Sequence, residues 1–223
     1  MMRSCRKGIT RDHELLLTER ELRQEGFCFI AGVDEAGRGP LAGPVVAAAV
    51  ILPDAAELPG FFDSKQLTDH DRRILRDELL SLDGCFYSVV EADSATIDRI
   101  NILNATHQAM RQAVLQLKQQ ADFVLVDGLP VKGFAVPCRN LIKGDARSAS
   151  IAAASILAKV HRDELMEKYD EMYPGYGFAS HMGYGTAAHL EALKKLGPCP
   201  IHRMTFRPVR ETIEPPPEQM ELF

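Results

Sequence analysis

The sequence predicts a mixed α/β fold, with a central sheet flanked by helices and a helical C-terminal part. Two apolar runs, residues 27–33 and 45–52, are joined by a short glycine-rich segment, a pattern typical of neighbouring strands. A third apolar run, residues 123–126, is short enough to be another buried strand. An alanine-rich helical pattern over residues 151–169 comes after these runs. Strands followed mostly by helices indicate a sheet that helices cover.

The remaining elements follow from local signals. In chain order we expect an opening helix over residues 11–24, a loop over 53–66, a helix from 68 to about 82, a strand over 86–90, a helical region from 93 to about 120, a loop over 174–185 and a helix over 186–196. Thr68 and Asp71 form a capping-box pattern at the start of the second helix. Three consecutive prolines break regular structure near the end. We therefore divide the chain into a lead and helix (1–26), a main domain (27–210) and an acidic, proline-rich flexible tail (211–223).

Composition excludes several protein classes. The chain has 223 residues, of which 46% are hydrophobic and 26% charged, which is ordinary for a globular protein and not for a disordered or fibrous one. No apolar run approaches the roughly 18 residues that span a membrane, and no hydrophobic leader is visible, so we expect a cytoplasmic protein. The five cysteines contain no Cys-x-x-Cys pair, which indicates reduced thiols. We interpret His107, His161, His181 and His202, which lack metal-binding spacing, as cap, packing or surface residues.

The net charge of −5 is unevenly distributed. Residues 211–223 contain four glutamates and no basic residue, so the rest of the chain is close to neutral. A near-neutral domain with clustered bases can still bind phosphates. The net charge therefore does not exclude a nucleic-acid partner.

Four carboxylates stand at the ends of apolar runs. Asp34 and Glu35 follow the first run, Asp127 follows the third, and Asp145 comes shortly after residues 141–142. Acids at several strand ends converge on one edge of a sheet, and their hard oxygen atoms suit Mg²⁺ or Mn²⁺. Because neighbouring residues on a strand point to opposite faces, Asp34 and Glu35 would flank one site only if the backbone turns there, as the glycines that follow permit. The alternative is that these acids are turn or cap residues without chemistry.

The segment Gly37-Arg38-Gly39 lies directly after the first pair of acids. It is superficially similar to a dinucleotide-binding fingerprint, but Gly43, Pro44 and a β-branched run stand where the helix of such a motif would begin. A Rossmann site is therefore excluded. What remains is a loop whose backbone can approach a ligand closely and which carries one guanidinium.

These residues belong to a longer pattern. The stretch AGVDEAGRGPLAGPV, residues 31–45, closely resembles the signature of ribonuclease HII, the type 2 ribonuclease H family. Further blocks of the same resemblance follow in family order at residues 63–65, 101–106, 126–128, 143–145, 153–160, 162–163 and 183–186. The resemblance therefore extends over roughly residues 20–210.

The resemblance implies a ribonuclease H-like fold and an endonuclease that cuts the RNA strand of RNA–DNA duplexes. It also implies cleavage 5′ of single ribonucleotides embedded in DNA, leaving 3′-hydroxyl and 5′-phosphate ends, during DNA repair and replication. The four acids of the family fall on Asp34, Glu35, Asp127 and Asp145, which would be the catalytic residues and the ligands of two Mg²⁺ or Mn²⁺ ions. Asp145 would serve the second ion or steer protons. Clustered carboxylates raise one another's pKa unless cations lie among them, which agrees with such a centre.

A ribonuclease H must tell ribose from deoxyribose by one hydroxyl. A 2′-OH both donates and accepts hydrogen bonds, and backbone groups near Gly37 and Gly39 could reach it, while Arg38 could bind a phosphate. By resemblance, Tyr184 packs on the following deoxyribose and its hydroxyl helps to read the ribose. Met182 departs from the family, whose members often have a lysine there. The other candidate substrate contacts are Ser64, Lys65, Lys143, Arg147, Lys159 and Arg162.

The chain ends in the sequence QMELF, beyond the prolines. Its pattern of Gln219, Leu222 and Phe223 resembles the short peptides with which bacterial replication and repair proteins bind the sliding clamp. Such a peptide places its two apolar residues in a groove of the partner. The alternative is an end that carries two apolar residues by chance.

We expect a monomeric, Mg²⁺- or Mn²⁺-dependent endoribonuclease that acts on RNA–DNA duplexes. Three alternatives remain open. The first is a nucleic-acid binder without catalysis, which the four acids disfavour. The second is the sister type 3 ribonuclease H, whose additional N-terminal domain has no room in the short lead before residue 27. The third is a metal-dependent phosphatase that acts on small molecules.

Overall fold

The fold is organised around one five-stranded mixed sheet. The computed structural model describes residues 15–54 and 67–213. Strand β1 (Ile30–Ala36) pairs antiparallel with β2 (Val45–Ile51), as the two apolar runs predicted, and parallel with β4 (Phe123–Asp127). The parallel pairing brings the carboxyl ends of β1 and β4 to the same edge of the sheet. The strands lie in the order β3 (Phe86–Ala92), β2 (Val45–Ile51), β1 (Ile30–Ala36), β4 (Phe123–Asp127) and β5 (Cys138–Leu141).

Strand β1 is longer at its C-terminal end than the sequence suggested. Asp34 pairs with Ala48 and Glu35 with Ala47, so the ladder with β2 continues through both acids to Ala36. The backbone therefore does not make the turn that the following glycines would permit at this pair of acids, yet the charge of Glu35 still acts on Asp34. The two carboxylates leave opposite faces of an extended strand, and the glycine loop begins only after Ala36.

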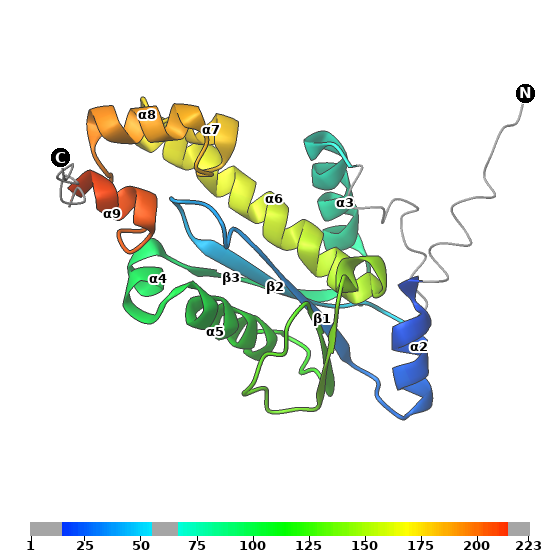
Figure 1. Cartoon of the computed structure of the whole chain (residues 1–223). Coiled ribbons are helices and arrows are strands. Elements are labelled where there is room, and N and C mark those ends of the chain that lie inside the picture. The colour runs from blue at the N-terminus through cyan, green and yellow to red at the C-terminus, as the bar shows by residue number, and fades with distance from the viewer. Residues whose placement is uncertain (1–14, 55–66, 214–223) are drawn as a thin grey trace, which may run out of the picture.

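Helices cover both faces of the sheet (Figure 1). α6 (Ala149–Met172) and α3 (Asp69–Ser81) pack on one face, and α4 (Ser94–Ile100) and α5 (Ile102–Leu115) pack on the other. Successive residues of β2 alternate between the two cores. A side chain at Gly32 would overlap the backbone of Ser150, so glycine at this position lets α6 lie directly on β1.

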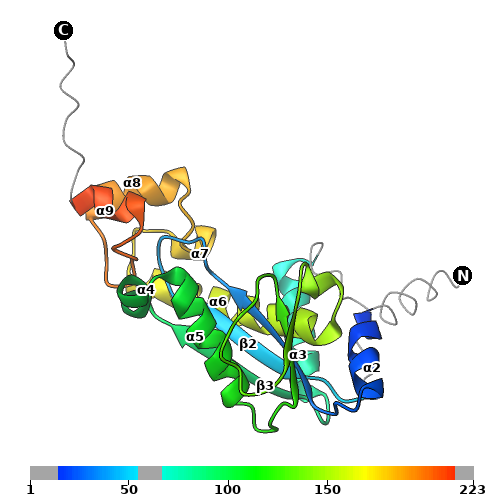
Figure 2. The same cartoon turned by 60° about the horizontal axis from the view of Figure 1, so that its bottom comes forward.

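The two ends of the described chain are attached differently. α2 (Leu17–Gln24) packs against the sheet through Leu22, close to the start of β1. The short helices α7 (Phe178–His181), α8 (Ala187–Leu196) and α9 (Arg207–Ile213) gather beyond the C-terminal end of α6 (Figure 2). The loop after β1 reaches this C-terminal part, because the Gly43 N–H donates to the Ile201 carbonyl at 2.9 Å. Two distant parts of the sequence thus meet at the end of β1.

Some local predictions are confirmed and others are corrected. The capping box of Thr68 and Asp71 is present with both of its hydrogen bonds. The helical region predicted from 93 to about 120 is two helices, because Asn101 adopts a φ of 65° and its side chain caps α5. The loop predicted over 174–185 contains the short helix α7. α9 extends to Ile213, so the first three residues of the segment 211–223 are helical.

Several predictions fall on residues 1–14, 55–66 and 214–223, which lie outside the described structure. Among the predicted site residues these are Ser64, Lys65, Gln219, Leu222 and Phe223. Within residues 15–54 and 67–213, every helix is too short or too polar to cross a membrane.

Candidate active site

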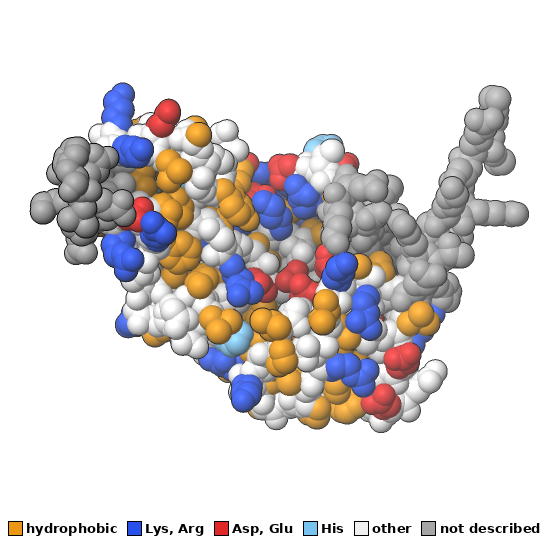
Figure 3. Space-filling model, in the orientation of Figure 1, with side chains coloured by type: hydrophobic (Ala, Val, Ile, Leu, Met, Phe, Trp, Pro, Cys, Tyr) orange, Lys and Arg blue, Asp and Glu red, His pale blue; other side chains and the backbone are white. Residues whose placement is uncertain are grey.

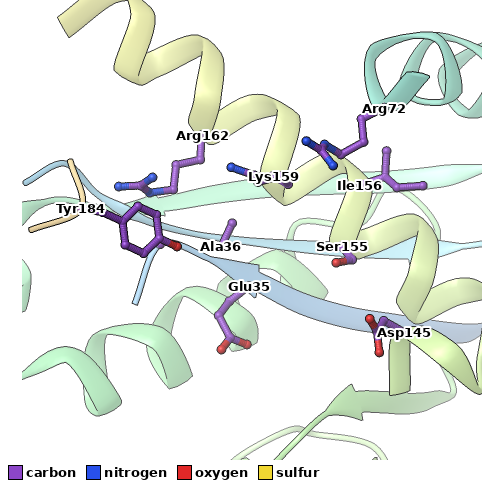
Figure 4. Close-up of a pocket in the computed structure, with 10 residues that line it drawn as sticks. Glu35, Ala36, Arg72, Asp145, Ser155, Ile156, Lys159, Arg162 and Tyr184 are labelled. Carbon is purple, nitrogen blue, oxygen red and sulfur yellow. The ribbon is translucent and has the colours of Figure 1, made fainter. Parts of the chain in front are cut away.

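A pocket of about 350 Å³ lies where the end of β1 meets helix α6 (Figure 4). On this hollowed face, acidic side chains lie in the middle and Lys and Arg side chains surround them (Figure 3). Ten residues line the pocket, and six of them were predicted as site residues: Glu35, Gly37, Asp145, Lys159, Arg162 and Tyr184. The other four, to which the sequence assigned no role, are Ala36, Arg72, Ser155 and Ile156.

Asp34 lies under helix α6 and is only 6% exposed. One of its carboxylate oxygens accepts the main-chain N–H of Glu35 at 2.7 Å, and the hydroxyl of Ser155 donates a further hydrogen bond to this carboxylate. Burial raises the pKa of Asp34 well above its usual range, and the negative charges of Glu35 and Asp127 raise it further. Burial and the two neighbouring negative charges therefore disfavour the ionised form of this acid.

Glu35 lines the pocket and faces a cation of its own loop. Its Oε1 lies 3.3 Å from Nη1 of Arg38. Burial raises the pKa of Glu35, and Asp127 adds to this effect while Arg38 opposes it. Arg38, predicted as a phosphate contact, is thus also the ion-pair partner of a predicted catalytic acid.

Asp127 ends β4 and is tied to the turn that carries Asp145. Its Oδ1 accepts a hydrogen bond from the main-chain N–H of Gly144 at 2.5 Å. Gly144 begins the 3₁₀ turn η1 (Gly144–Ala146), so Asp145 is the next residue and lines the pocket. One hydrogen bond thus sets the position of two predicted acids relative to each other.

The acids form an interacting group at the edge of the sheet. Asp34, Glu35 and Asp127 are close enough for their charges to act on one another, and Asp145 lines the same pocket as Glu35. Within the described ranges, no three acidic, histidine or cysteine side chains already enclose a metal position. The group offers carboxylate oxygens whose charge is opposed by burial and repulsion, and this is a donor set suited to a hard divalent cation.

Three of the predicted basic contacts lie where a phosphate could reach them. Lys143 and Arg147 flank the turn of Asp145 and are exposed. Lys159 projects from α6 into the pocket, and its Nζ lies 2.7 Å from a carboxylate oxygen of Asp163. This ion pair leaves the side chain of Lys159 37% exposed.

Arg162 does not have the exposed position that a phosphate contact would need. The residue is 1% exposed, and its guanidinium donates to the carbonyls of Pro44 and Ala42 at 3.1 and 3.2 Å. Gly37 adopts a φ of 94°, and a Cβ there would overlap the Arg162 side chain. The structure therefore favours a role for Arg162 in supporting the loop over the predicted contact with substrate.

The glycine loop faces the predicted ribose-reading tyrosine. A Cβ on Gly39 would lie 3.5 Å from Cε1 of Tyr184, whose side chain is half-exposed at the pocket. Arg203, which the sequence did not single out, supports the loop from below through the carbonyls of Gly37 and Arg38. No local signal could have found it, because it lies 166 residues from Gly37.

The histidines near the site pack within the C-terminal part. His202 and His189 are buried and contact each other, and the His181 ring stacks on His189. His161 is half-exposed and lies 2.8 Å from a carboxylate oxygen of Glu91. Packing and surface roles are therefore confirmed for His202, His181 and His161.

Known proteins are similar to this chain both in sequence and in fold. The family model for ribonuclease HII matches residues 31–209. Ribonuclease HII of Geobacter metallireducens is 54% identical over 204 residues, which cover 92% of this chain and 95% of that protein. Ribonuclease HII of Chlamydia abortus is 53% identical over 193 residues, covering 86% and 91%.

Two solved structures share the fold of this chain. Ribonuclease H2 from Pyrococcus horikoshii has a TM-score of 0.70 at 29% identity, covering 83% of this chain and 97% of that one. The ribonuclease HII of Archaeoglobus fulgidus, solved as a complex with PCNA, has a TM-score of 0.69 at 28% identity, covering 80% and 95%. The predicted ribonuclease H-like fold is thereby confirmed. More than half of the aligned residues are identical to those of ribonuclease HII from Geobacter metallireducens, over nearly the whole length of both chains. The chain therefore belongs to the ribonuclease HII family and is an endonucleolytic hydrolase of the ribonuclease H class.

Proposed function

We propose that this enzyme cuts the RNA strand of RNA–DNA duplexes and cuts 5′ of single ribonucleotides embedded in DNA, leaving 3′-hydroxyl and 5′-phosphate ends. The observation that carries the proposal is the group of interacting carboxylates at the ends of β1 and β4, which lies beside a glycine loop facing Tyr184. The first feature is suited to phosphodiester hydrolysis and the second to close inspection of a sugar.

The carboxylates Asp34, Glu35, Asp127 and Asp145 would hold two Mg²⁺ or Mn²⁺ ions. Carboxylate oxygens are the ligands that these cations prefer, and a cation would relieve the penalty that burial and repulsion place on Asp34 and Glu35. When bound, the ions supply activation of a water and stabilisation of the leaving 3′ oxygen. Ser155 and Gly144 orient Asp34 and Asp127 for this task.

The substrate strand would be read from the other side of the pocket. Gly37 and Gly39 let main-chain groups approach the 2′-OH, and the ring of Tyr184 stands beside Gly39, where it can pack on the next sugar. Lys143, Arg147 and Lys159, with Ser64 and Lys65 from the segment outside the described structure, would contact phosphates. Such contacts position the duplex, and the sugar contacts select the cleavage site.

The test is cleavage of a DNA duplex that carries one ribonucleotide, with Mg²⁺, with Mn²⁺ and with EDTA, and with the ends of the products mapped. We expect one cut 5′ of the ribonucleotide only when a divalent cation is present, and none in the all-DNA duplex. Asp127→Asn should abolish cutting and still bind the duplex. A protein that hydrolyses a small phosphate ester and leaves this duplex intact would favour the phosphatase alternative and overturn the proposal.

We further infer that the C-terminal peptide with Gln219, Leu222 and Phe223 binds the sliding clamp. The Archaeoglobus relative was solved as a complex with PCNA, which supports a link between this family and such a partner. Clamp affinity measured with the full chain should fall at least about tenfold on removal of residues 218–223, because the two apolar side chains are lost. The double substitution Leu222→Ala/Phe223→Ala should reproduce the loss, whereas Met220→Ala should not. Equal affinity of the full and truncated chains would refute the inference.

We also propose that the enzyme works as a monomer in the cytoplasm, on DNA that is being replicated or repaired. Light scattering at micromolar concentration should give one chain mass, since one chain supplies every group assigned to the site. A mass of two chains at these concentrations would contradict the monomer.

A further inference from the structure

Arg203 is a buried cation whose guanidinium donates hydrogen bonds to main-chain carbonyls of the glycine loop, residues 37–43. The residue has no exposed surface. Its Nε donates to the Gly43 carbonyl at 3.0 Å, Nη1 to the Arg38 carbonyl at 2.9 Å and Nη2 to the Gly37 carbonyl at 2.5 Å. Burial lowers the pKa of Arg203 to about 9, and the nearby charge of Arg162 contributes, so the guanidinium stays cationic at neutral pH. A buried charge of this kind is a poor way to gain stability alone, which points to a positional role.

The hydrogen bonds of Arg203 fix the direction of two peptide groups. The described chain has no cis peptide bond. In a trans peptide the C=O and the N–H point in opposite directions. The carbonyls of Gly37 and Arg38 point toward Arg203, because they accept its hydrogen bonds. The N–H groups of the same two peptides, which belong to Arg38 and Gly39, therefore point away from Arg203. Neither N–H has an acceptor among the described residues, so both remain available to an oxygen of a ligand.

His202, the neighbour of Arg203, is connected to the main chain of Tyr184. The Cys199 N–H donates to Nδ1 of His202 at 2.9 Å. The proton of neutral His202 is therefore on Nε2, which lies 3.1 Å from Nε2 of His189. That contact makes Nε2 of His189 the acceptor, so its Nδ1–H donates to the Tyr184 carbonyl at 2.9 Å. This assignment satisfies every ring nitrogen of the two buried histidines.

His202 and Arg203, which make the hydrogen bonds toward Tyr184 and toward the glycine loop, are adjacent in the sequence. Main-chain contacts reinforce them: the Arg203 N–H donates to the Leu41 carbonyl, and Ala42 pairs with His202 as an isolated bridge. The loop and the tyrosine also touch directly, since the Leu41 N–H donates to the Gly183 carbonyl at 2.8 Å. The glycine loop and Tyr184, which are distant in sequence, are thus held by the same two residues.

We propose that His202 and Arg203 are positioning residues for ribose recognition, which set the spacing between the N–H groups of the Gly37–Gly39 loop and the ring of Tyr184. The proposal rests on the proposed function of this loop and this tyrosine. Neither residue touches substrate. Each acts through a group that does, Arg203 through two peptide groups and His202 through His189.

The test compares binding to two DNA duplexes, one with a single ribonucleotide and one without. Binding is measured in the Asp127→Asn background, so that neither duplex is cut, and the readout is the ratio of the two dissociation constants. Arg203→Lys keeps the charge and loses the fork that holds two carbonyls. It should reduce the preference for the ribonucleotide at least about fivefold and change the affinity for all-DNA duplex less than about twofold. Arg207→Lys, an exposed arginine on the nearby α9, is the matched control and should leave the ratio unchanged.

A second variant separates the two connections and covers the case that Arg203→Lys does not fold. His202→Asn keeps an acceptor for the Cys199 N–H and loses the donor to His189. It should reduce the preference in the presence of Tyr184 and have no further effect once Tyr184→Ala is introduced, whereas Arg203→Lys should still act in that background.

The outcomes distinguish this inference from the proposed function. If the parent protein does not prefer the ribonucleotide duplex, the proposed function itself fails. If the parent prefers it and folded Arg203→Lys or His202→Asn keeps the full ratio, the positioning role is wrong. An equal loss of affinity for both duplexes shows a merely structural role and also refutes the inference.

Discussion

The main-chain N–H of Gly144 lies 2.5 Å from Oδ1 of Asp127, and this contact ties the end of β4 to the turn of Asp145. Position 144 has little room for a side chain. A Cβ there would lie 3.0 Å from the same Asp127 oxygen and 2.7 Å from Cδ1 of Ile151. The glycine therefore allows the backbone to approach the carboxylate from one side and the core from the other.

Gly144→Ala should damage catalysis more than binding. The added methyl group pushes the Asp127 carboxylate from its place, and such a displacement typically lowers kcat by about tenfold to a hundredfold. The duplex is held mainly by other groups, so its dissociation constant should change little. Single-turnover cleavage at saturating enzyme measures the first quantity, and fluorescence anisotropy measures the second.

Ile151→Val provides the control for Gly144→Ala, because valine lacks the Cδ1 atom that the new methyl group would strike. Alone it should cost about 1 kcal/mol of unfolding free energy and keep kcat. Combined with Gly144→Ala it removes the core clash and leaves the clash with Asp127. A double variant with normal kcat would show that the contact with Asp127 is not the cause of the defect.

Asp34→Asn should stabilise the protein in the absence of divalent cations. Burial raises the pKa of Asp34, so its contribution to stability is lost as pH rises through the folded pKa, and the ionised form destabilises the fold. The amide removes this charge, and we expect a gain of about 1 kcal/mol in unfolding free energy at pH 8 in EDTA. Urea unfolding measures the gain. Added Mg²⁺ or Mn²⁺ should stabilise the parent protein and stabilise the variant less.

Asp122→Asn supplies a contrast of opposite sign. Its carboxylate accepts the N–H groups of Cys28 and Phe29 at 2.7 and 2.9 Å and lies near an exposed turn. Loss of the charge weakens these two hydrogen bonds, so this variant should be destabilised with or without divalent cations. A stabilised Asp122→Asn, or a destabilised Asp34→Asn, would contradict the different environments that the structure gives the two acids.

Patterns that are local in sequence were predicted well, and those that depend on the whole fold were not. The capping box at Thr68 needs only four consecutive residues, and the acid at position 127 follows an obvious buried strand. The break at Asn101 was missed because the apolar periodicity of α5 runs on from α4 with little interruption. Ser155 stands in a predicted helix, but only the packing of α6 on β1 shows that its hydroxyl reaches Asp34.

The residues that support the glycine loop could not be predicted from the sequence either, because their contacts also join distant parts of the chain. Arg162 and Arg203 resemble ordinary surface cations in sequence, and an exposed phosphate contact was the natural expectation for the first. Their burial follows from the return of the C-terminal part to the end of β1, where loop carbonyls replace water around each guanidinium. A buried arginine is therefore visible only once the long-range contacts are known.

Glu19 should prove to be a stabilising residue at the start of the helix that carries much of the site. It is 1% exposed, and its Oε1 accepts hydrogen bonds from Ser148 Oγ at 2.6 Å, Ser150 N at 3.0 Å and Ser150 Oγ at 2.8 Å. These groups lie at the positive end of α6, where a carboxylate is favourable. Glu19→Ala should lower the unfolding free energy by about 2–3 kcal/mol, measured by urea denaturation.

The matched control for Glu19→Ala is Glu21→Ala, on the exposed side of the same helix. It removes the same number of atoms and should change stability by less than about 0.5 kcal/mol. Equal effects of the two substitutions would mean that α2 itself, and not its contact with α6, is being measured.

His202 should make the protein sensitive to mild acid. Burial, together with a smaller effect of the His189 charge, lowers the pKa of His202 from its ordinary value near 6.5 to about 4. A histidine with a depressed folded pKa binds its proton first in the unfolded chain, so its contribution to stability is complete above pH 6.5 and is lost as the pH falls toward 4. At pH 5 the loss from this residue amounts to about 2 kcal/mol.

Urea unfolding of the parent protein and of His202→Asn between pH 7.5 and pH 5 measures this effect. Carboxylates also titrate in this range, and they do so in both proteins, so the difference between the two curves isolates the histidine. The variant should be less stable than the parent at pH 7.5, because the donor to His189 is lost, and the gap should narrow as the pH falls. Parallel curves for His202→Asn and the parent would contradict this prediction. They would mean that the buried pair of imidazole rings takes up a proton at no cost in stability, although the two Nε2 atoms lie 3.1 Å apart and only one of them can carry a hydrogen.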